Sequence, residues 1–205
     1  MYLSRAKASR KLPLPRKGTK YLARASSHLN SGVPVVIAIR DMLKLAKTSK
    51  EVKKMINERM IKINGKEVKD LKESIKLFNL LTIGETYKLI LSNFKKFDFE
   101  KVEDKSRIAK VINKKILGKK KIQLNLHDGT NILTDKLVKI NDSIELDLKN
   151  KLIKIIKMEK GNELFIFSGK NAGKTGKLLE IDKNKIKIEV EGKILALGKS
   201  LLIVK

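Results

Sequence analysis

The segment FSGKNAGKTGKLL, residues 167–179, contains the glycines, lysines and threonine that a nucleotide-binding phosphate loop would use. Such a loop needs a glycine, four further residues and then Gly-Lys-Thr/Ser at the start of a helix, because consecutive backbone N–H groups must surround a phosphate. Counting back from Gly173, the required first glycine falls on Ser168. Thr175 is followed by Gly176, a poor helix starter, and then by KLLEI, which favours a strand. The spacing therefore argues against nucleotide hydrolysis at this segment.

The same glycines fit a turn between two strands. ELFIF precedes them and KLLEID follows, while Gly169, Gly173 and Gly176 supply backbone conformations that other residues resist. This arrangement resembles the KOW motif, a short strand–loop–strand unit in small barrels of ribosomal and transcription proteins. A generic hairpin without a ligand is the alternative. In the KOW interpretation, RNA phosphates would be contacted by three lysines, Lys170, Lys174 and Lys177.

The chain that surrounds this segment is strongly basic. Lys and Arg number 48 against 22 Asp and Glu, giving a formal net charge of +26 and a pI near 10.1. Such a chain repels itself unless a polyanion neutralises it, and a pI above ~9 is typical of nucleic-acid binding. The sequence has no apolar run near the ~18 residues of a membrane span and no aromatic-bearing amphipathic helix. We expect a nucleic-acid partner and no membrane.

Residues for other chemistry are scarce. The absence of cysteine excludes disulfides, thiolate catalysis and thiolate zinc sites. The histidines, His28 and His127, lie about a hundred residues apart, and each is better interpreted as a hydrogen-bonding or RNA-contacting residue than as a metal ligand. No Ser/His/Asp arrangement or paired carboxylate is evident. We expect no enzyme activity, cofactor, metal or small-molecule substrate.

Residues 1–32 contain no acidic residue, and Pro13 and Pro15 interrupt any helix. The segment cannot bury enough apolar surface to fold alone, so we expect a basic arm that becomes ordered on RNA. An organellar transit peptide is also basic and acid-poor. The basic character continues through the whole chain, however, which favours the RNA-binding arm. Its expected RNA contacts are Arg5, Arg10, Lys11, Arg16, Lys17, Lys20 and Arg24.

Residues 33–95 predict two helices followed by a hairpin. VVIAIRDMLKLAK (35–47) places apolar residues on one helical face, and TSKE forms a capping box of Thr48 and Glu51 before SKEVKKMINERM. Asn64-Gly65 in MIKINGKEVKD is a favoured two-residue hairpin turn, and TIGETYKLIL (82–91) predicts a closing strand. This unit predicts a compact RNA-binding module. Its expected RNA contacts are Arg40, Lys44, Lys47, Lys50, Lys53, Lys54, Arg59, Lys62 and Lys66.

The rest of the chain predicts strands. FKKFDFEKVED (94–104) is interpreted as a charged connector, and residues 96–159 as a mixed or β-rich central domain with a scaffold role. Turns are expected at Gly118, at HDGTN (127–131) and at Lys149-Asn150. Residues 160–205 contain short strands separated by Gly and Asn turns, which predict a small β-barrel. The predicted fold class is therefore α+β and multidomain.

The order of these elements resembles the archaeal and eukaryotic small-subunit ribosomal protein family S-four-e. IRDMLKLAKTSKEVKKMINERMIKINGKEVKD (39–70) is similar to the S-four-type RNA-binding module of that family, with Arg40, Lys44, Glu51-Val52, Gly65-Lys66 and Asp70 at its motif positions. HDGTNIL, KINDSIELDL and FSGKNAGKTGKL resemble later landmarks in the right order. The resemblance covers nearly the whole chain and implies a structural constituent of the small ribosomal subunit that binds ribosomal RNA.

The implied partners are ribosomal RNA and neighbouring ribosomal proteins, and the implied location is the cytoplasm, bound to the ribosome. The abundance of lysine agrees with phosphate-dominated, shape-based recognition rather than with stacking on single-stranded bases. Two alternatives remain. One is a KOW-containing transcription or translation factor that binds RNA transiently. The other is an RNA-modifying or nucleotide-hydrolysing enzyme that uses this module for targeting.

Overall fold

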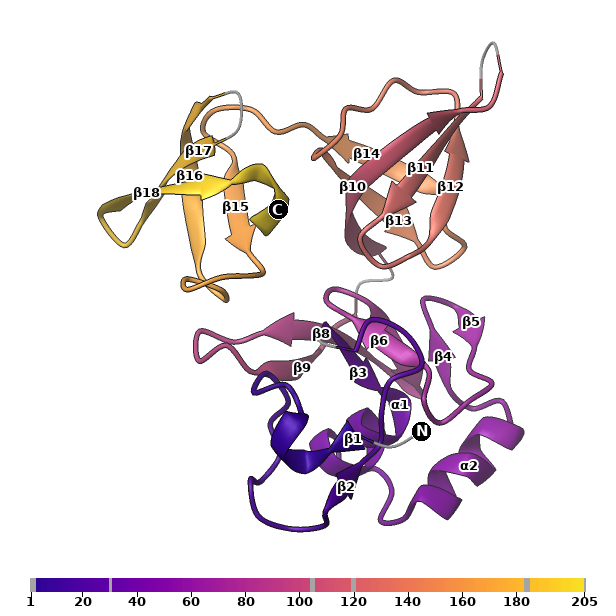
Figure 1. Cartoon of the computed structure of the whole chain (residues 1–205). Coiled ribbons are helices and arrows are strands. Elements are labelled where there is room, and N and C mark those ends of the chain that lie inside the picture. Colours follow the sequence, from indigo (N-terminus) through magenta and orange to yellow (C-terminus); the bar gives the residue numbers. More distant parts are fainter. Residues whose placement is uncertain (1–2, 30, 104–105, 119–120, 183–184, 205) are drawn as a thin grey trace. The chain divides into compact units, whose positions relative to one another are not determined.

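The computed structural model describes residues 3–29, 31–103, 106–118, 121–182 and 185–204. The chain forms two compact units, residues 1–104 and 105–205. Strands predominate over helices in both units (Figure 1). The mixed, strand-rich composition agrees with the expected α+β class. Within the described residues, no helix is long and apolar enough to cross a membrane.

The N-terminal arm is packed onto the first unit. Strand β1 (Leu3–Ser4) pairs with β2 (Tyr21–Leu22), and a 3-10 turn, Arg5–Lys7, follows β1. The arm buries Leu12, Leu22 and Ala25. It also shares backbone hydrogen bonds with later segments, because Ser26 N donates to Lys72 O (2.8 Å) and Phe97 N donates to Lys11 O (2.7 Å). In the described residues, partners far along the chain therefore supply the burial that the arm lacks by itself.

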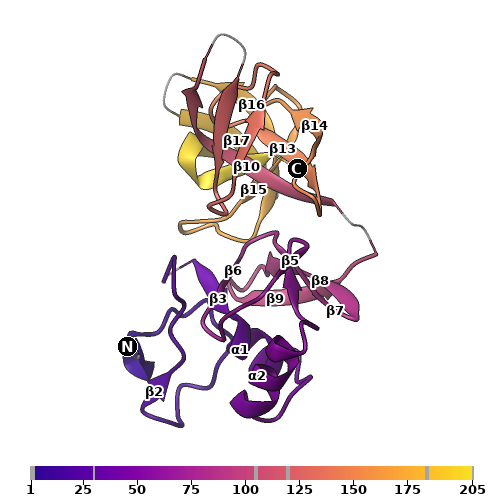
Figure 2. The same cartoon turned by 90° about the vertical axis from the view of Figure 1, so that its right-hand side faces the viewer.

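The helices of the first unit are shorter than the sequence pattern predicts. Helix α1 (Val35–Ile37) continues directly into a π-helical turn, η2 (Ala38–Met42), and α2 (Ser49–Asn57) follows. The first helix ends before Lys44, whose φ of 57° is incompatible with a continuing right-handed helix. Of the apolar residues expected on one face of this helix, Ile37, Ile39 and Ala46 are buried, and Leu43 is partly buried. Helix α2 lies beside the α1–η2 segment in both views (Figures 1 and 2).

The predicted capping box starts α2. Thr48 Oγ1 accepts a hydrogen bond from Glu51 N (3.3 Å), and Glu51 Oε2 accepts one from Lys47 N (2.8 Å). These bonds satisfy backbone donors that a helix N-terminus otherwise leaves unpaired. Hydrogen bonds from Lys47 N and from the Thr48 hydroxyl, in that order of importance, hold the pKa of Glu51 below its ordinary value. The local sequence signal was therefore confirmed.

The first unit also contains a sheet of five strands, in the order β5-β4-β7-β8-β9. Asn64 (φ 50°) and Gly65 (φ 80°) form the predicted turn between β4 and β5, and buried Asn64 Oδ1 accepts from Leu80 N (2.9 Å). A separate pair is formed by β3 (Gly32–Pro34) and β6 (Ser74–Lys76). The strands of the five-stranded sheet are β4 (Lys62–Ile63), β5 (Lys66–Glu67), β7 (Leu80–Ile83), β8 (Glu85–Leu91) and β9 (Phe97–Lys101).

Two predictions for this sheet were wrong. Residues 82–91 do not form a single closing strand, because the chain turns at Gly84 (φ 70°) between β7 and β8. The supposed connector at 94–104 contains β9, which pairs with β8 along its whole length. Its alternating aromatic and charged residues fit a strand that buries Phe97 and exposes Asp98. The segment was interpreted as a connector because of its many charged residues.

In the second unit, residues 106–156 form a sheet in the order β12-β11-β10-β13-β14. Its core contains Val111, Leu124, Ile144 and Leu146, each fully or nearly fully buried. The turns predicted at 127–131 and 149–150 are present, but the strand between the first of them and residue 135 was not predicted. The strands are β10 (Ser106–Ile116), β11 (Ile122–Leu126), β12 (Asn131–Thr134), β13 (Ser143–Asp147) and β14 (Leu152–Ile156).

A buried arginine ties the loops of this sheet together. Arg107 on β10 is 1% exposed and forms an ion pair with Asp128, whose side chain is fully buried. The guanidinium also donates to Asn150 Oδ1 (2.8 Å) and Thr130 Oγ1 (3.3 Å). Burial by itself would raise the pKa of Asp128, but Arg107 and the hydrogen bonds from Thr130 outweigh it and hold that pKa below its ordinary value. Two predicted turns are thus fixed by one residue.

The C-terminal part of the second unit forms a sheet in the order β18-β17-β16-β15-β19. Its core includes Leu164, Ile166, Ile188 and Leu202. All of these strands lie where short apolar runs predicted them, with a 3-10 turn at Lys199–Leu201 before the last. The strands are β15 (Glu163–Ile166), β16 (Thr175–Ile181), β17 (Lys185–Val190), β18 (Lys193–Gly198) and β19 (Leu202–Val204).

Candidate nucleic-acid interface

Helix α2 presents a basic face to solvent. Val52 and Ile56 point into the core, while the basic residues of the helix and of the turn after it are exposed. Two of these basic residues form loose ion pairs, Lys54 with Glu58 (3.9 Å) and Arg59 with Glu67 (3.8 Å). Exposed pairs of this kind contribute about 0–1 kcal/mol, so they hold the cations only weakly. The exposed basic residues here are Lys50, Lys53, Lys54 and Arg59.

Further exposed cations flank this helix. Lys44 and Lys47 lie in the connection before α2, and Lys62 and Lys66 lie on either side of the β4–β5 turn. Because Ile63 and Asn64 between them are buried, the turn is fixed and its lysines project from a rigid support. Together with the cations of α2, these residues form what we call the module cations.

Arg40 differs from the other predicted contacts. Its guanidinium makes a two-bond fork with Asp41, with Nε to Oδ1 at 3.0 Å and Nη2 to Oδ2 at 2.8 Å, and Nη1 donates to Ser49 Oγ (3.0 Å). The hydrogen bond to Asp41, partly opposed by burial, raises the pKa of Arg40 further above its ordinary value. All three of its nitrogens therefore have protein partners, and in this structure Arg40 joins η2 to the start of α2.

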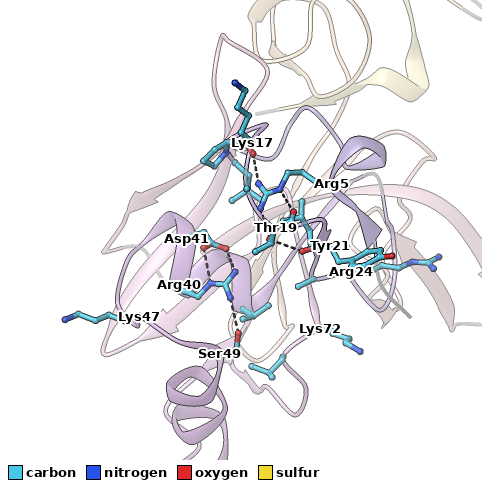
Figure 3. A pocket seen from close by; sticks show the side chains of 17 residues that line it. Arg5, Lys17, Thr19, Tyr21, Arg24, Arg40, Asp41, Lys47, Ser49 and Lys72 are labelled. Carbon is cyan, nitrogen blue, oxygen red and sulfur yellow. Dashed lines mark hydrogen bonds and ion pairs between the residues drawn. The ribbon is translucent and has the colours of Figure 1, made fainter.

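Arg5 in the arm is engaged in the same way. Its guanidinium donates to Thr19 O (2.7 Å), Pro15 O (2.5 Å) and Thr19 Oγ1 (2.9 Å). These bonds hold the loop 15–19 against the first turn of the arm (Figure 3). Gly18 at φ 140° lies under the guanidinium, and a Cβ there would meet Arg5 Nη2 at 3.0 Å. Arg5 thus shapes the arm instead of reaching freely into solvent.

The remaining predicted arm cations fall into two groups. Lys11 and Arg24 are partly buried, and Lys11 Nζ lies 5.9 Å from the centre of the Phe97 ring. Burial lowers the pKa of Lys11. The others are exposed and available to a polyanion: Arg10, Arg16, Lys17 and Lys20.

A pocket of about 820 Å³ lies between the arm and the helical segment of the first unit (Figure 3). Its lining brings together Arg5, Lys17 and Arg24 from the arm with Arg40 and Lys47 from the helices. The sequence patterns separate the arm from the module, so they did not predict that the two share one cavity. Lys72, which also lines the pocket, was missed entirely, because nothing in its local sequence distinguishes it from other exposed lysines.

In the second unit, the glycine-rich segment forms a strand–loop–strand arrangement, as predicted. Gly169 (φ 94°) and Gly173 (φ 96°) take conformations that favour glycine, and Gly173 N donates to Ile166 O (2.8 Å). Gly176 lies in β16, where a Cβ would come within 2.5 Å of Glu189 O. Thr175 begins this strand and no helix follows it, so the arrangement is not that of a nucleotide-binding phosphate loop.

The lysines of this loop differ in their surroundings. Lys170 and Lys177 are exposed, whereas Lys174 Nζ is 2.5 Å from Glu191 Oε2. Lys174 is thus half-buried and paired, while its two neighbours present their charge to solvent. The loop combines glycine-rich backbone and cationic side chains, which are the groups that contact a phosphate chain.

The histidines have separate settings. His127 Nδ1 accepts a hydrogen bond from Lys110 N (3.1 Å), so that nitrogen carries no proton and the ring fixes a turn. His28 is exposed with φ 51°, and burial of part of the ring, followed by the charge of Lys76, lowers its pKa. No group of three or more His, Asp or Glu side chains suited to a metal ion occurs in the part of the chain that the structure describes.

Comparison with known proteins identifies relatives among ribosomal proteins. A model of "Ribosomal family S4e" matches residues 83–160. Small ribosomal subunit protein eS4 of Methanocella arvoryzae is 33% identical over 188 residues, which cover 88% of this chain and 80% of the relative. The protein of the same name from Methanospirillum hungatei is 32% identical over 191 residues, covering 87% and 79%.

A solved structure agrees with these relatives. The crystal structure of 30S ribosomal protein S4e from Thermoplasma acidophilum superposes with a TM-score of 0.72 at 26% sequence identity, covering 85% of this chain and 94% of that one. The likeness thus extends over both units rather than over one motif. The chain belongs to the ribosomal protein family S4e.

Proposed function

We propose that this small-subunit ribosomal protein binds ribosomal RNA directly, as a scaffold, through the cations of its first unit and the glycine-rich loop of its second. The observation that carries the proposal is that α2 has two different faces: its apolar residues are buried and its lysines are exposed to solvent. Lysines placed on a rigid helix and hairpin act as point charges for phosphates. With a net charge of +26, the chain needs a polyanion as its partner.

The proposed organisation has a basic arm at residues 1–32 and an S-four-like RNA-binding module at 33–95. Because β9 pairs with β8 in the first unit, the β-rich central domain begins after this strand, and not at residue 96 as the sequence suggests, and it extends to 159. A KOW-type small barrel occupies 160–205. The protein would act in the cytoplasm on the ribosome, beside other ribosomal proteins, without catalysing a reaction. Two observations support this view: the arm and the hairpin bring their predicted cations onto one compact unit, and Lys170 and Lys177 in and after the glycine-rich loop are exposed.

The proposal is tested by removing two module cations. Lys53→Ala together with Arg59→Ala should weaken binding of small-subunit ribosomal RNA about tenfold at moderate salt. The slope of log affinity against log salt should also become shallower by about 0.9 for each phosphate that the variant no longer neutralises. Filter binding across a salt series measures both quantities. Thermal unfolding should not change, because both side chains are exposed.

A matched control is Lys95→Ala with Lys96→Ala, in the turn between β8 and β9. Both lysines are exposed, and Lys95 (φ 60°) shares the left-handed conformation of Arg59 (φ 55°). The control removes the same charge and leaves all of the module cations in place. Equal weakening of RNA binding in the two double variants would mean that only net charge matters and that the module does not form the RNA contact.

The glycine-rich loop also fits a factor that binds RNA transiently, since the KOW motif occurs in such proteins. Copy number distinguishes the two roles: a structural constituent is present at about one copy per small subunit after sedimentation in high salt. A clearly substoichiometric amount would favour the transient factor.

A further inference from the structure

The pocket of the first unit has apolar walls. Leu14, Tyr21 and Leu22 from the arm line it together with Val36 and Leu71, around a volume of about 820 Å³. Pockets that hold small organic groups have volumes of roughly 300–1,000 Å³ and are lined mainly by apolar side chains. Polyanion binding alone needs no such cavity, because phosphates are contacted from flat basic surfaces.

The rim of this pocket is basic on several sides. Lys17 and Arg24 from the arm, Lys47 before α2, and Lys72 after the β5 strand extend outward from it in different directions (Figure 3). Asp41 is the acidic residue of the lining, and its carboxylate is held in the fork of Arg40. An occupant of this pocket therefore meets apolar surface inside and positive charge outside.

We propose that the pocket receives a single unstacked nucleotide of ribosomal RNA, with its base against the apolar walls and Tyr21 and its flanking phosphates on the rim. The inference rests on the proposed RNA binding by the first unit. Proteins that contact non-helical RNA commonly place splayed bases on aromatic side chains. An apolar peptide would fit the walls but would gain nothing from a rim of cations, whereas a nucleotide matches both.

The pocket is already formed in the chain without RNA. Arg5 holds the loop 15–19 through Thr19 and Pro15, and Arg40 joins η2 to Ser49, which also lines the pocket. Both guanidinium groups are thus positioning residues that fix the walls. A preformed cavity loses less entropy on binding than one that must be assembled around the base.

The absence of tryptophan from the chain makes a direct test possible. Tyr21→Trp places a single indole on the pocket wall, and Phe94→Trp places one at a site that is 88% exposed in the turn between β8 and β9. Each full-length variant is titrated with small-subunit ribosomal RNA and, separately, with heparin, a polyanion without bases. We expect RNA to quench Tyr21→Trp at least twofold through base stacking, heparin to leave it nearly unchanged, and Phe94→Trp to respond weakly to both.

Three results separate the inference from the function on which it rests. Equal quenching by RNA and heparin would overturn the nucleotide pocket, since charge alone would explain the signal. An unresponsive indole in a variant that still retains RNA on filters would also overturn it, and would leave RNA binding intact. Failure of the unmodified chain to bind RNA at all would defeat both proposals.

A second variant fills the pocket. Ala23→Phe adds a ring to the lining, and we expect about tenfold weaker RNA binding with an unchanged salt slope, because every phosphate-binding cation is retained. Ala6→Phe, on the exposed side of the 3-10 turn in the arm, is the matched control and should bind as the unmodified chain does. Unchanged affinity in Ala23→Phe, with folding intact by circular dichroism, would contradict the inference.

Discussion

Arg5 in the first unit and Arg107 in the second each hold a distant loop in place, but in opposite surroundings. Arg5 donates to carbonyl and hydroxyl oxygens at an exposed site, whereas Arg107 is 1% exposed and paired with a fully buried carboxylate. When an exposed arginine is removed, water replaces its bonds. A buried one leaves behind a charge that water cannot reach. The same residue type therefore shapes a binding surface in one unit and specifies the fold in the other.

The largest expected effect in this comparison is that of Arg107→Met, which removes the buried partner of Asp128. We expect the second unit to lose about 3–5 kcal/mol of unfolding free energy, because Asp128 remains buried without its partner. Chemical denaturation of the full chain, followed by a probe in the second unit, measures the loss. Arg107→Met with Asp128→Leu should recover most of it. A double variant as unstable as the single one would show that the hydrogen bonds to Asn150 and Thr130, rather than the unpaired charge, dominate.

Lys110 is a second buried cation of the second unit, and its effect on stability depends on pH. It is 2% exposed, Nζ donates to Lys199 O (2.6 Å), and burial lowers its pKa from 10.5 to about 8. Between pH 8 and 10.5 the unfolded chain binds more protons at this residue than the folded one, so its contribution to stability rises with pH in that window and is constant below it. Lys110→Met should remove this rise, as measured by unfolding at about pH 7.5, 9 and 10. An identical pH profile in the variant would contradict the assignment.

A smaller effect is expected at Arg5. Arg5→Met should cost about 1–2 kcal/mol of local stability, since the carbonyls it serves can hydrate. Hydrogen exchange should rise in the arm and not in β7 or β8. If Arg5→Met lost as much unfolding free energy as Arg107→Met, the proposed difference between an exposed and a buried arginine would be wrong.

The smallest change is Arg40→Lys, which keeps the charge but cannot reproduce the fork with Asp41. We expect a loss of about 0.5–1 kcal/mol in thermal unfolding. Asp41→Asn is the companion variant and should have a similar cost. A much larger cost in either would indicate that the wall of the pocket collapses with this pair.

Local signals in the sequence were the most informative about the fold. Asn64-Gly65 and the Thr48–Glu51 box each act within a few residues, and both occur as predicted. The Gly84 turn was missed because one glycine among β-forming residues fits a continuous strand as well as a hairpin. Arg107 and Asp128 lie 21 residues apart with no shared pattern, so their pairing depends on the register of β10 and β11.

The predicted cations were found largely at the surface, but their environments could not be predicted. Exposure of Lys53 follows from helical periodicity alone. The partners of Arg5, by contrast, depend on how the arm folds back at residues 15–19, and those of Arg40 depend on how η2 lies against the start of α2. The abundance of lysine suggested that RNA is recognised through its phosphates and not through stacking on its bases, and the position of Tyr21 in the pocket is the reason to reconsider this.

The pairing of β15 with β19 has a consequence for how the second unit folds. β16, β17 and β18 can form as successive local hairpins, but β15 obtains its second neighbour only when residue 202 reaches residue 166. Closing such a long loop costs entropy before any contact offsets it, so this pairing should form last. Until then, one side of β15 is an open strand edge with unpaired backbone groups. The slowest step in the folding of this sheet is therefore also the one that replaces the open edge of β15 with that of a shorter strand, β19.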